Sequence, residues 1–332
     1  MSSFLPTWAQ EKLRVMTFNI RLETTSDGIN QWQNRKEYVA STIVFHEVAL
    51  CGLQEAFIGQ IKDLQTQLPS YEFVGKGRDD GDQKGEFSCI LYDKQKINIL
   101  KSGTFWLSET PEKPGFGWDA KHNRVVTWAY CQEKQTKKKF YVFNTHFDHQ
   151  GVVARRESAH LLKQKVQEIA GKNPAIVMGD FNAEITQEPM AILTKKTEKE
   201  VHLIDTKAIS ETLHFGPNGT FTGFQQAELS ENAIDHILVT PTWKVNENIA
   251  TGPGVFDMKA GFIQALYSLA NIDNAKDKIA LIATTDEETG SVTSKDLINR
   301  VSKAAEAVLV FEASLDGKVK TGRKGTSMYQ IN

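Results

Sequence analysis

The chain of 332 residues has only three cysteines, and none of its eight histidines lies after His236. Cysteine and histidine are the side chains that most often bind transition metals. No two cysteines have the C-x-x-C spacing, which favours reduced, buried thiols over a disulfide framework or a zinc knuckle. No apolar run is long enough to cross a bilayer. The net charge of -2 argues against non-specific binding to long nucleic acids. Residues 1–14 lack the apolar core of a signal peptide, so we expect a cytoplasmic protein.

Apolar patterning divides the chain into two parts. In the first, helical spacing predicts helices at 32–46, 57–68 and 154–170, and short apolar runs predict strands at 13–20, 48–53, 71–74, 87–92, 97–105, 124–131, 140–145, 175–178 and 234–239. This mixed order, with several hairpins, favours a layered α/β sandwich. In the second part we expect helices at 259–269 and 295–305 and strands at 279–284 and 308–311.

Polar motifs stand at the ends of five predicted strands: Asn19, Glu55, Asn-Thr-His at 144–146, Gly-Asp-Phe-Asn at 179–182, and Asp-His at 235–236. Strand ends are where open sheets gather catalytic groups. Mg²⁺ takes oxygen ligands such as those of a glutamate or an asparagine. An aspartate near the metal can align a water, and amide or imidazole groups can stabilise charge on phosphoryl oxygens. The pattern therefore indicates metal-assisted cleavage of a phosphoester.

Taken together and in this order, the motifs resemble those of the endonuclease/exonuclease/phosphatase superfamily over residues 12–245. The resemblance implies a DNase I-like α/β/β/α sandwich of four layers, a Mg²⁺ or Mn²⁺ cofactor, and a phosphate-ester substrate that is a nucleic acid or a small phosphoester. It also implies roles for single residues: metal binding for Glu55 and Asn19, contact with the scissile phosphate for His146, orientation of water for Asp180, and transition-state stabilisation for Asn182.

Three further residues have two interpretations each. By resemblance Arg124 contacts phosphate, but its place on a predicted hairpin also fits a surface arginine. Asp148 and His149 follow the strand that ends at His146, which fits substrate-facing groups, a second metal site, or ordinary polar loop residues.

Asp235 marks the point where the family pattern breaks. By resemblance it orients a catalytic histidine in a later Ser-Asp-His motif, but no such motif follows it. Strand alternation turns His236 away from Asp235, so His236 is no substitute. The family's second metal carboxylate and last core strand are missing with the motif. We therefore expect impaired catalysis and an incomplete sheet, for which residues 279–284 are a candidate replacement strand.

A second set of motifs occupies residues 252–261, 284–291, 310–312 and 321–325. These strings resemble the aminoacylase/glutamate-carboxypeptidase family of zinc peptidases. The resemblance implies a bridging ligand, a general base and two further ligands, in the order Asp257, Glu287, Glu288 and Glu312. The histidines of that family are absent, and zinc prefers nitrogen and sulfur ligands. We therefore interpret residues 250–332 as a truncated α/β peptidase segment with vestigial site residues, fused to a domain at 1–247.

Three functional hypotheses follow. The first is a metal-dependent phosphoester or phosphodiester hydrolase, carried by residues 12–245. The second is a zinc-dependent amidohydrolase or exopeptidase, carried by residues 250–332. The third is a non-catalytic fusion. The first part retains most of its site residues, which favours the hydrolase. The sequence leaves the substrate and the oligomeric state open.

Overall fold

The structure is a computed structural model that describes residues 12–198, 200–212, 218–221, 223–224, 232–245 and 295–303. The chain divides into two compact units, Met1–Ile249 and Ala250–Asn332. The described part of the second unit is helix α7 (Lys295–Ser302), where a helix is predicted. The other elements predicted after residue 250 lie outside the described residues, as do Asp257, Glu287, Glu288 and Glu312. No described helix has the length and apolarity to span a bilayer.

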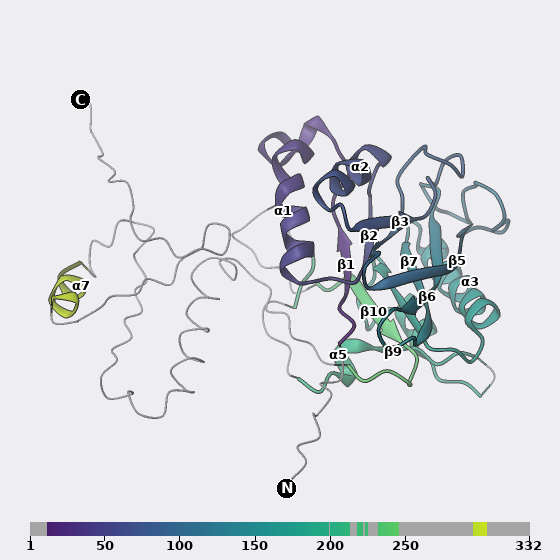
Figure 1. The fold of residues 1–332 in the computed structure, drawn as a ribbon. Coiled ribbons are helices and arrows are strands. Elements are labelled where there is room, and N and C mark those ends of the chain that lie inside the picture. Colours follow the sequence, from purple (N-terminus) through teal and green to yellow (C-terminus); the bar gives the residue numbers. More distant parts are fainter. Residues whose placement is uncertain are drawn as a thin grey trace, which may run out of the picture. The chain divides into compact units, whose positions relative to one another are not determined.

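The first sheet has the strand order β1-β2-β4-β3. Its strands are β1 (Val15–Asn19), β2 (Leu50–Gln54), β3 (Tyr71–Val74) and β4 (Ile90–Asp93). β1 and β2 are parallel, and the other pairs are antiparallel. The helices between these strands in sequence are η1 (Thr25–Asn30), α1 (Trp32–Phe45) and α2 (Ile58–Gln67). Apolar residues of α1 and α2 form one core with the outer face of this sheet (Figure 1).

The second sheet has the order β5-β6-β7-β8-β10-β9. Its strands are β5 (Ile97–Trp106), β6 (Val125–Glu133), β7 (Lys139–His146), β8 (Ala175–Asp180), β9 (Ile204–Asp205) and β10 (Asp235–Val239). Its helices are α3 (Val152–Ala170), α4 (Glu188–Thr194) and α5 (Thr206–Ile209). α3 joins the parallel strands β7 and β8 and ends at Gly171, whose φ of 59° suits a glycine. A second core lies between this sheet and helices α3 and α4.

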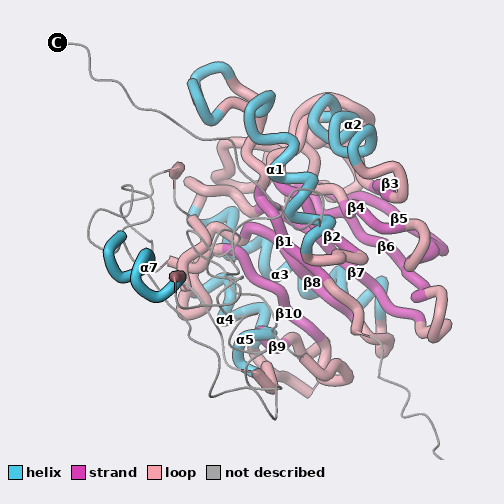
Figure 2. Tube along the Cα trace, turned by 60° about the vertical axis from the view of Figure 1, so that its left-hand side comes forward, coloured by secondary structure: helices cyan, strands magenta, loops and turns pink. Residues whose placement is uncertain are grey.

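A third core lies between the two sheets. It joins residues such as Leu50 and Ile90 of the first sheet to Val142 and Met178 of the second. Three cores stacked in this way produce four layers, helices, sheet, sheet, helices, which confirms the predicted sandwich (Figure 2). The three cysteines are buried and unpaired within these layers, as predicted. Burial raises the pKa of the Cys89 and Cys131 thiols to about 12.

Asn144 connects the two sheets through polar contacts inside the sandwich. Its Nδ2 donates to the carbonyl oxygens of Leu53 (2.9 Å) and Cys89 (2.7 Å), and its Oδ1 accepts from Gln54 Nε2 (2.7 Å). The fit is close at Gly52, where a Cβ atom would lie 2.5 Å from Asn144 Oδ1. These bonds fix the relative position of the two sheets near the strand ends that carry the predicted site residues.

The loop between β3 and β4 folds back over the same strand ends. Phe87, predicted as the first residue of a strand, instead forms isolated bridges to Ala56 and Gly77, and β4 begins at Ile90. Arg78 N donates to Glu86 O (3.1 Å), which closes the loop on itself. The loop thereby brings the side chains of Arg78 and Glu86 to the site.

Candidate active site

The centre of the site joins the two sheets through Asn19. This residue ends β1, and its Nδ2 donates to Glu55 Oε1 (3.0 Å) and to Asp180 Oδ2 (2.9 Å) at the end of β8. Glu55 follows β2 in a left-handed conformation, with a φ of 60°, and its Oε2 accepts from Leu22 N (3.1 Å). The structure therefore brings together the two predicted metal-binding residues and the predicted water-orienting aspartate.

His146 lies beside Asp180 because their strands pair in parallel register. The distance from His146 Nε2 to Asp180 Oδ2 is 3.7 Å. Burial, then the charges of Arg124 and Arg78, hold the pKa of His146 well below its ordinary value. Burial also raises the pKa of Asp180, although hydrogen bonds from Asn19 and Asn182 oppose the shift. At neutral pH His146 is therefore an uncharged imidazole.

Asp235 lies opposite Asp180 in the antiparallel pairing of β10 with β8. Its Oδ1 is buried and has no hydrogen-bond partner among the described residues. Burial and the charge of Asp180 raise the pKa of Asp235 to about 8. His236 faces away, as strand alternation predicts, and its Nε2 lies 3.0 Å from Ala183 O.

Asn182 completes the central group. Its φ is 46°, and this turn lets its backbone N–H donate to Asp180 Oδ1 (2.9 Å). Its side-chain Nδ2 donates to Phe147 O (3.0 Å), next to His146. The amide is thus held at the rim where the scissile phosphate is expected.

Arg124 is buried, with 4% of its side chain exposed, so it is not the surface arginine of the alternative interpretation. Its Nε lies 3.5 Å from Asp148 Oδ2, and its Nη2 lies 3.2 Å from His149 Nδ1. The His149 ring stacks on that of His122, with 5.7 Å between centroids. Arg124, Asp148 and His149 therefore form one connected group beside His146.

Asp148 accepts hydrogen bonds from the backbone of two loops. Its oxygens accept from the N–H groups of Lys121, His122, Gln150 and Gly151, at 2.8–3.2 Å. Burial raises the pKa of Asp148, but these bonds and the charge of Arg124 outweigh it and hold the pKa at about 2. Its carboxylate therefore stays charged and positions the loops that carry His122 and His149.

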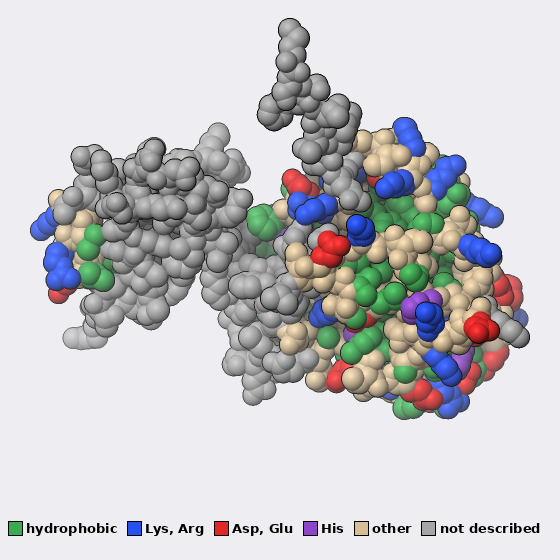
Figure 3. Space-filling model, turned by 90° about the horizontal axis from the view of Figure 1, so that it is seen from below, with side chains coloured by type: hydrophobic (Ala, Val, Ile, Leu, Met, Phe, Trp, Pro, Cys, Tyr) green, Lys and Arg blue, Asp and Glu red, His purple; other side chains and the backbone are tan. Residues whose placement is uncertain are grey.

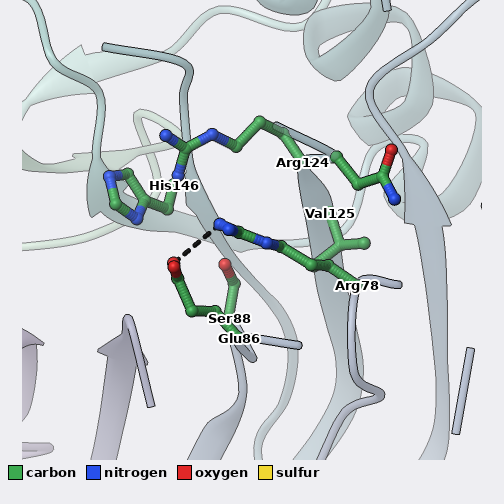
Figure 4. A pocket seen from close by; sticks show the side chains of 7 residues that line it. Arg78, Glu86, Ser88, Arg124, Val125 and His146 are labelled. Carbon is green, nitrogen blue, oxygen red and sulfur yellow. Dashed lines mark hydrogen bonds and ion pairs between the residues drawn. The ribbon is translucent and has the colours of Figure 1, made fainter. Parts of the chain in front are cut away.

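Sequence reasoning missed part of the site. A narrow hollow next to His146, without room for a water molecule, is lined by Arg78, Glu86, Ser88, Asn123, Arg124, Val125 and His146 (Figure 4). Arg78 Nη1 donates to Glu86 Oε2 at 2.7 Å. Arg78 and Glu86 belong to a glycine-rich polar loop, a pattern that predicts a turn and gives no sign of a site.

A second hollow, of about 250 Å³, adjoins Asn19. Its lining is largely apolar and aromatic and consists of Phe18, Asn19, Ile20, Arg21, Arg35, Tyr38, Val39, Thr42 and Phe224. The two hollows differ in chemistry, since the one beside His146 is lined mainly by charged and polar groups.

The centre fits a divalent cation held by few protein ligands. Glu55, Asp180 and Asp235 bring three carboxyl groups to this centre, and Arg21 Nη1 is 3.7 Å from Glu55 Oε2. Burial, and then the charges of the neighbouring carboxylates, raise the pKa of Asp180 and of Asp235. Among the described residues no three His, Cys, Asp or Glu side chains form a ready metal cluster. Glu55 and Asn19 offer oxygen atoms, which are the ligands that a hard divalent cation takes.

Comparison with known proteins agrees with this geometry. The model of the Endonuclease/Exonuclease/phosphatase family matches residues 16–256. The chain belongs to this family. A solved structure of a mannosyl-6-phosphatase from Bacteroides thetaiotaomicron is 38% identical, with a TM-score of 0.66 over 71% of this chain and 88% of that one. The human Nocturnin catalytic domain is 20% identical, with a TM-score of 0.53 over 69% of this chain and 83% of that one, and shares the fold. Members of the family are phosphoester hydrolases.

The end of the chain matches another family. The model of Peptidase family M20/M25/M40 matches residues 232–328. Carboxypeptidase G2 of Pseudomonas sp. is 35% identical over 102 residues, which are 29% of this chain and 25% of that protein. The chain therefore spans about a quarter of the length of this peptidase relative.

Proposed function

We propose that this chain is a Mg²⁺- or Mn²⁺-dependent phosphoester hydrolase whose site lies at the strand ends of residues 12–245. The observation that carries the proposal is the contact of Asn19 with both Glu55 and Asp180, with His146 Nε2 3.7 Å from the same Asp180 oxygen. Groups from β1, β2, β7 and β8 thus converge on one small region. This set can bind a cation, a water and a phosphate together.

The chain's own residues have separate parts in this reaction. Asp180 orients the attacking water, and its raised pKa brings it closer to the range of a general base. His146, uncharged, donates a hydrogen bond to a phosphoryl oxygen, and Asn182 stabilises charge as it develops there. Glu55, with Asn19 beside it, holds the cation, which when bound supplies Lewis-acid stabilisation of the phosphoryl oxygens. Asp235, without its histidine, stays protonated near neutral pH.

Small phosphoesters are the favoured substrates. The mannosyl-6-phosphatase is similar to this chain over most of its own length. The face in Figure 3 shows acidic and basic side chains interspersed among the described residues, without a continuous basic band. Binding to a long nucleic acid normally needs such a band. The largely apolar hollow beside Asn19 gives room for the uncharged part of a small substrate.

The test is hydrolysis of p-nitrophenyl phosphate and bis(p-nitrophenyl) phosphate by the full chain with Mg²⁺ or Mn²⁺. We expect activity that EDTA removes and that Asp180→Asn lowers by about 10²-fold or more, because a group that acts within a coupled site is lost. Glu72→Gln, which removes one exposed carboxylate ion-paired with Lys94, is the matched control and should keep full activity. Activity that survives EDTA or Asp180→Asn contradicts the proposal.

We further propose that residues 1–247 form the hydrolase domain and that residues 250–332 are a truncated peptidase segment without activity. The short peptidase match, about a quarter of its relative, supports this division. With Zn²⁺ or Co²⁺, the full chain should not hydrolyse acylated glutamate above the level of Glu287→Gln. Hydrolysis that this variant abolishes would instead support the zinc-dependent exopeptidase.

A further inference from the structure

The side chain of Glu55, the proposed metal ligand, is held by Asn19 and by the loop that follows β1. Its Oε1 accepts from Asn19 Nδ2 (3.0 Å), and its Oε2 accepts from the backbone N–H of Leu22 (3.1 Å). A carboxylate has about four lone-pair sites on its two oxygens. These two hydrogen bonds use one site on each oxygen and leave sites for a cation. The direction of the carboxylate therefore depends on where the loop places Leu22 N.

The loop that carries Leu22 has an unusual backbone conformation. Arg21 has a φ of 57°, in the left-handed region that residues other than glycine rarely adopt. Such a conformation is strained and persists only where the surrounding structure fixes it. One contact that fixes it is local, since Arg21 N donates to Asn19 Oδ1 (3.0 Å). Further contacts come from helices α1 and α2.

Gln60, in the first turn of α2, binds this loop through two of its residues. Its Nε2 donates to Arg21 O (2.9 Å), and its Oε1 accepts from Glu23 N (3.1 Å). The same Oε1 accepts from Phe57 N (3.0 Å), two residues after Glu55. The side chain of Gln60 is fully buried. One amide thus joins the loop that binds the Glu55 carboxylate to the segment that carries Glu55 itself.

Arg35 of α1 fixes the start of the loop independently of Gln60. Its Nη1 donates to Ile20 O (2.8 Å), and its Nη2 donates to Arg21 O (3.4 Å). The loop is therefore still attached to the fold when Gln60 is replaced. A variant at Gln60 tests the placement of Leu22 N, because the contacts of Arg35 keep the loop in the structure.

We propose that Gln60 is a positioning residue of the metal site and sets the direction of the Glu55 carboxylate through the N–H of Leu22. The inference rests on the proposed function and adds a residue to its metal site. Gln60 binds the residues before and after Leu22, so loss of its amide lets this N–H move away from Glu55 Oε2. Side chains that orient a metal ligand typically contribute roughly 10- to 100-fold to metal affinity.

Binding of Mn²⁺ to the full chain without substrate, measured by electron paramagnetic resonance of the free ion, tests the proposal. Gln60→Met keeps the length of the side chain and removes its three hydrogen bonds, so it should weaken Mn²⁺ binding about 10-fold or more. Gln60→Glu keeps an acceptor for both N–H groups in either protonation state and should bind Mn²⁺ within about 3-fold of the wild type. Gln67→Met, the same change in the last turn of α2, is the matched control and should leave the affinity unchanged.

A second control separates positioning from a general loss of stability. Lys163→Met removes the buried hydrogen bonds of Lys163 Nζ to Ile192 O and Lys195 O, which join α3 to α4 and the residue after it. It should lower the free energy of unfolding and leave the Mn²⁺ affinity unchanged. If Gln60→Met does not fold, Gln60→Asn replaces it with the same expected loss of affinity, because its shorter side chain cannot reach all three partners.

Kinetics on p-nitrophenyl phosphate give another readout. In Gln60→Met the Mg²⁺ concentration for half-maximal activity should rise about 10-fold, while kcat at saturating Mg²⁺ should fall less than about 3-fold. The proposal is overturned by unchanged Mn²⁺ affinity in the Gln60 variant, by an equal loss in Lys163→Met, or by a wild-type chain that does not bind Mn²⁺. If Mn²⁺ binding responds as expected but the wild-type chain hydrolyses no ester, the proposed function fails and the positioning of Glu55 stands.

Discussion

Asp235 and Asp180 face each other across two antiparallel strands, as paired residues of β10 and β8. Paired residues of an antiparallel sheet point to the same face, so the two carboxylates are neighbours. Asn19 and the N–H of Asn182 donate to Asp180, whereas Asp235 Oδ1 has no partner among the described residues. The folded chain therefore disfavours ionising both carboxylates at once.

This pair predicts an unusual dependence of stability on pH. The pKa of Asp235 is raised to about 8 in the folded chain, so between about pH 4 and pH 8 the folded state keeps a proton that the unfolded state has lost. That difference lowers the free energy of unfolding as the pH rises through this window. Asp235→Asn lacks the effect, and its amide can donate to Asp180. In EDTA it should be more stable than the wild type by about 1–4 kcal/mol at pH 8.5 and by much less at pH 4.5.

Urea unfolding of both proteins at the two pH values measures this difference. A stability difference of the same size at both pH values would show that Asp235 does not hold a proton at neutral pH.

Removal of the proposed metal ligand, the carboxylate of Glu55, should be visible in thermal stability. With 10 mM Mg²⁺ the wild-type chain should gain about 1 kcal/mol and melt ~2–4 °C higher, because a cation that binds the folded state alone stabilises it. Glu55→Gln should lose most of this gain. Glu72→Gln, at the exposed ion pair with Lys94, should retain it. Differential scanning fluorimetry with and without Mg²⁺ gives the answer, and an equal gain in Glu55→Gln would remove Glu55 from the metal site.

The close contact between the two sheets at Gly52 predicts that one added methyl group will strongly lower the stability of the fold. Gly52→Ala places a Cβ atom 2.5 Å from Asn144 Oδ1 and 2.9 Å from Met178 Cε, and these buried groups have little room to move. The variant should lose about 2–4 kcal/mol in urea unfolding, from overpacking and from disturbed hydrogen bonds of Asn144. Gly59→Ala in α2, where no atom lies within 4 Å of the added Cβ, is the control and should be neutral or slightly stabilising. Similar losses in both variants would contradict this account.

The pKa shift of Asp148 is opposite in sign to that of Asp235, and so is its effect on the pH dependence of stability. Its pKa is held at about 2, so it stabilises the folded chain above about pH 4, and this contribution disappears as the pH falls through 2. Asp148→Asn should therefore cost about 1–3 kcal/mol at pH 7, because several backbone N–H groups lose a charged acceptor. The cost should shrink below pH 4. Chemical unfolding of both proteins across this pH range measures the loss of stability in Asp148→Asn. A loss that does not change with pH would exclude the charge of Asp148 as its cause.

The sequence predicts the sandwich and the gathering of Asn19, Glu55, His146 and Asp180, since each follows a short apolar strand and strand ends meet at one edge. Arg78 and Glu86 could not be found in this way. They belong to a turn-rich loop, and only the bridges of Phe87 to Ala56 and Gly77 bring that loop over the site. Contacts of this kind depend on tertiary structure, which local sequence periodicity does not predict.

Asn144 shows a second limit of prediction from sequence patterns. Its place at the end of a strand marks it as a polar motif residue, yet its three hydrogen bonds hold the sheets together. A strand-end asparagine has the same sequence signature whether it faces a substrate or the facing sheet. The roles of Asp148 and His149 towards substrate stay predictions.

The three buried cysteines also allow the opening of the sandwich to be measured by thiol labelling. Cys51 and Cys89 belong to the core beneath α1 and α2, and Cys131 belongs to the core between the sheets. Only the thiolate reacts quickly with a thiol reagent, and burial suppresses its formation at all three positions. Labelling must therefore wait for the layers to separate. The labelling rate of each cysteine measures how often its own layer opens, without any added probe.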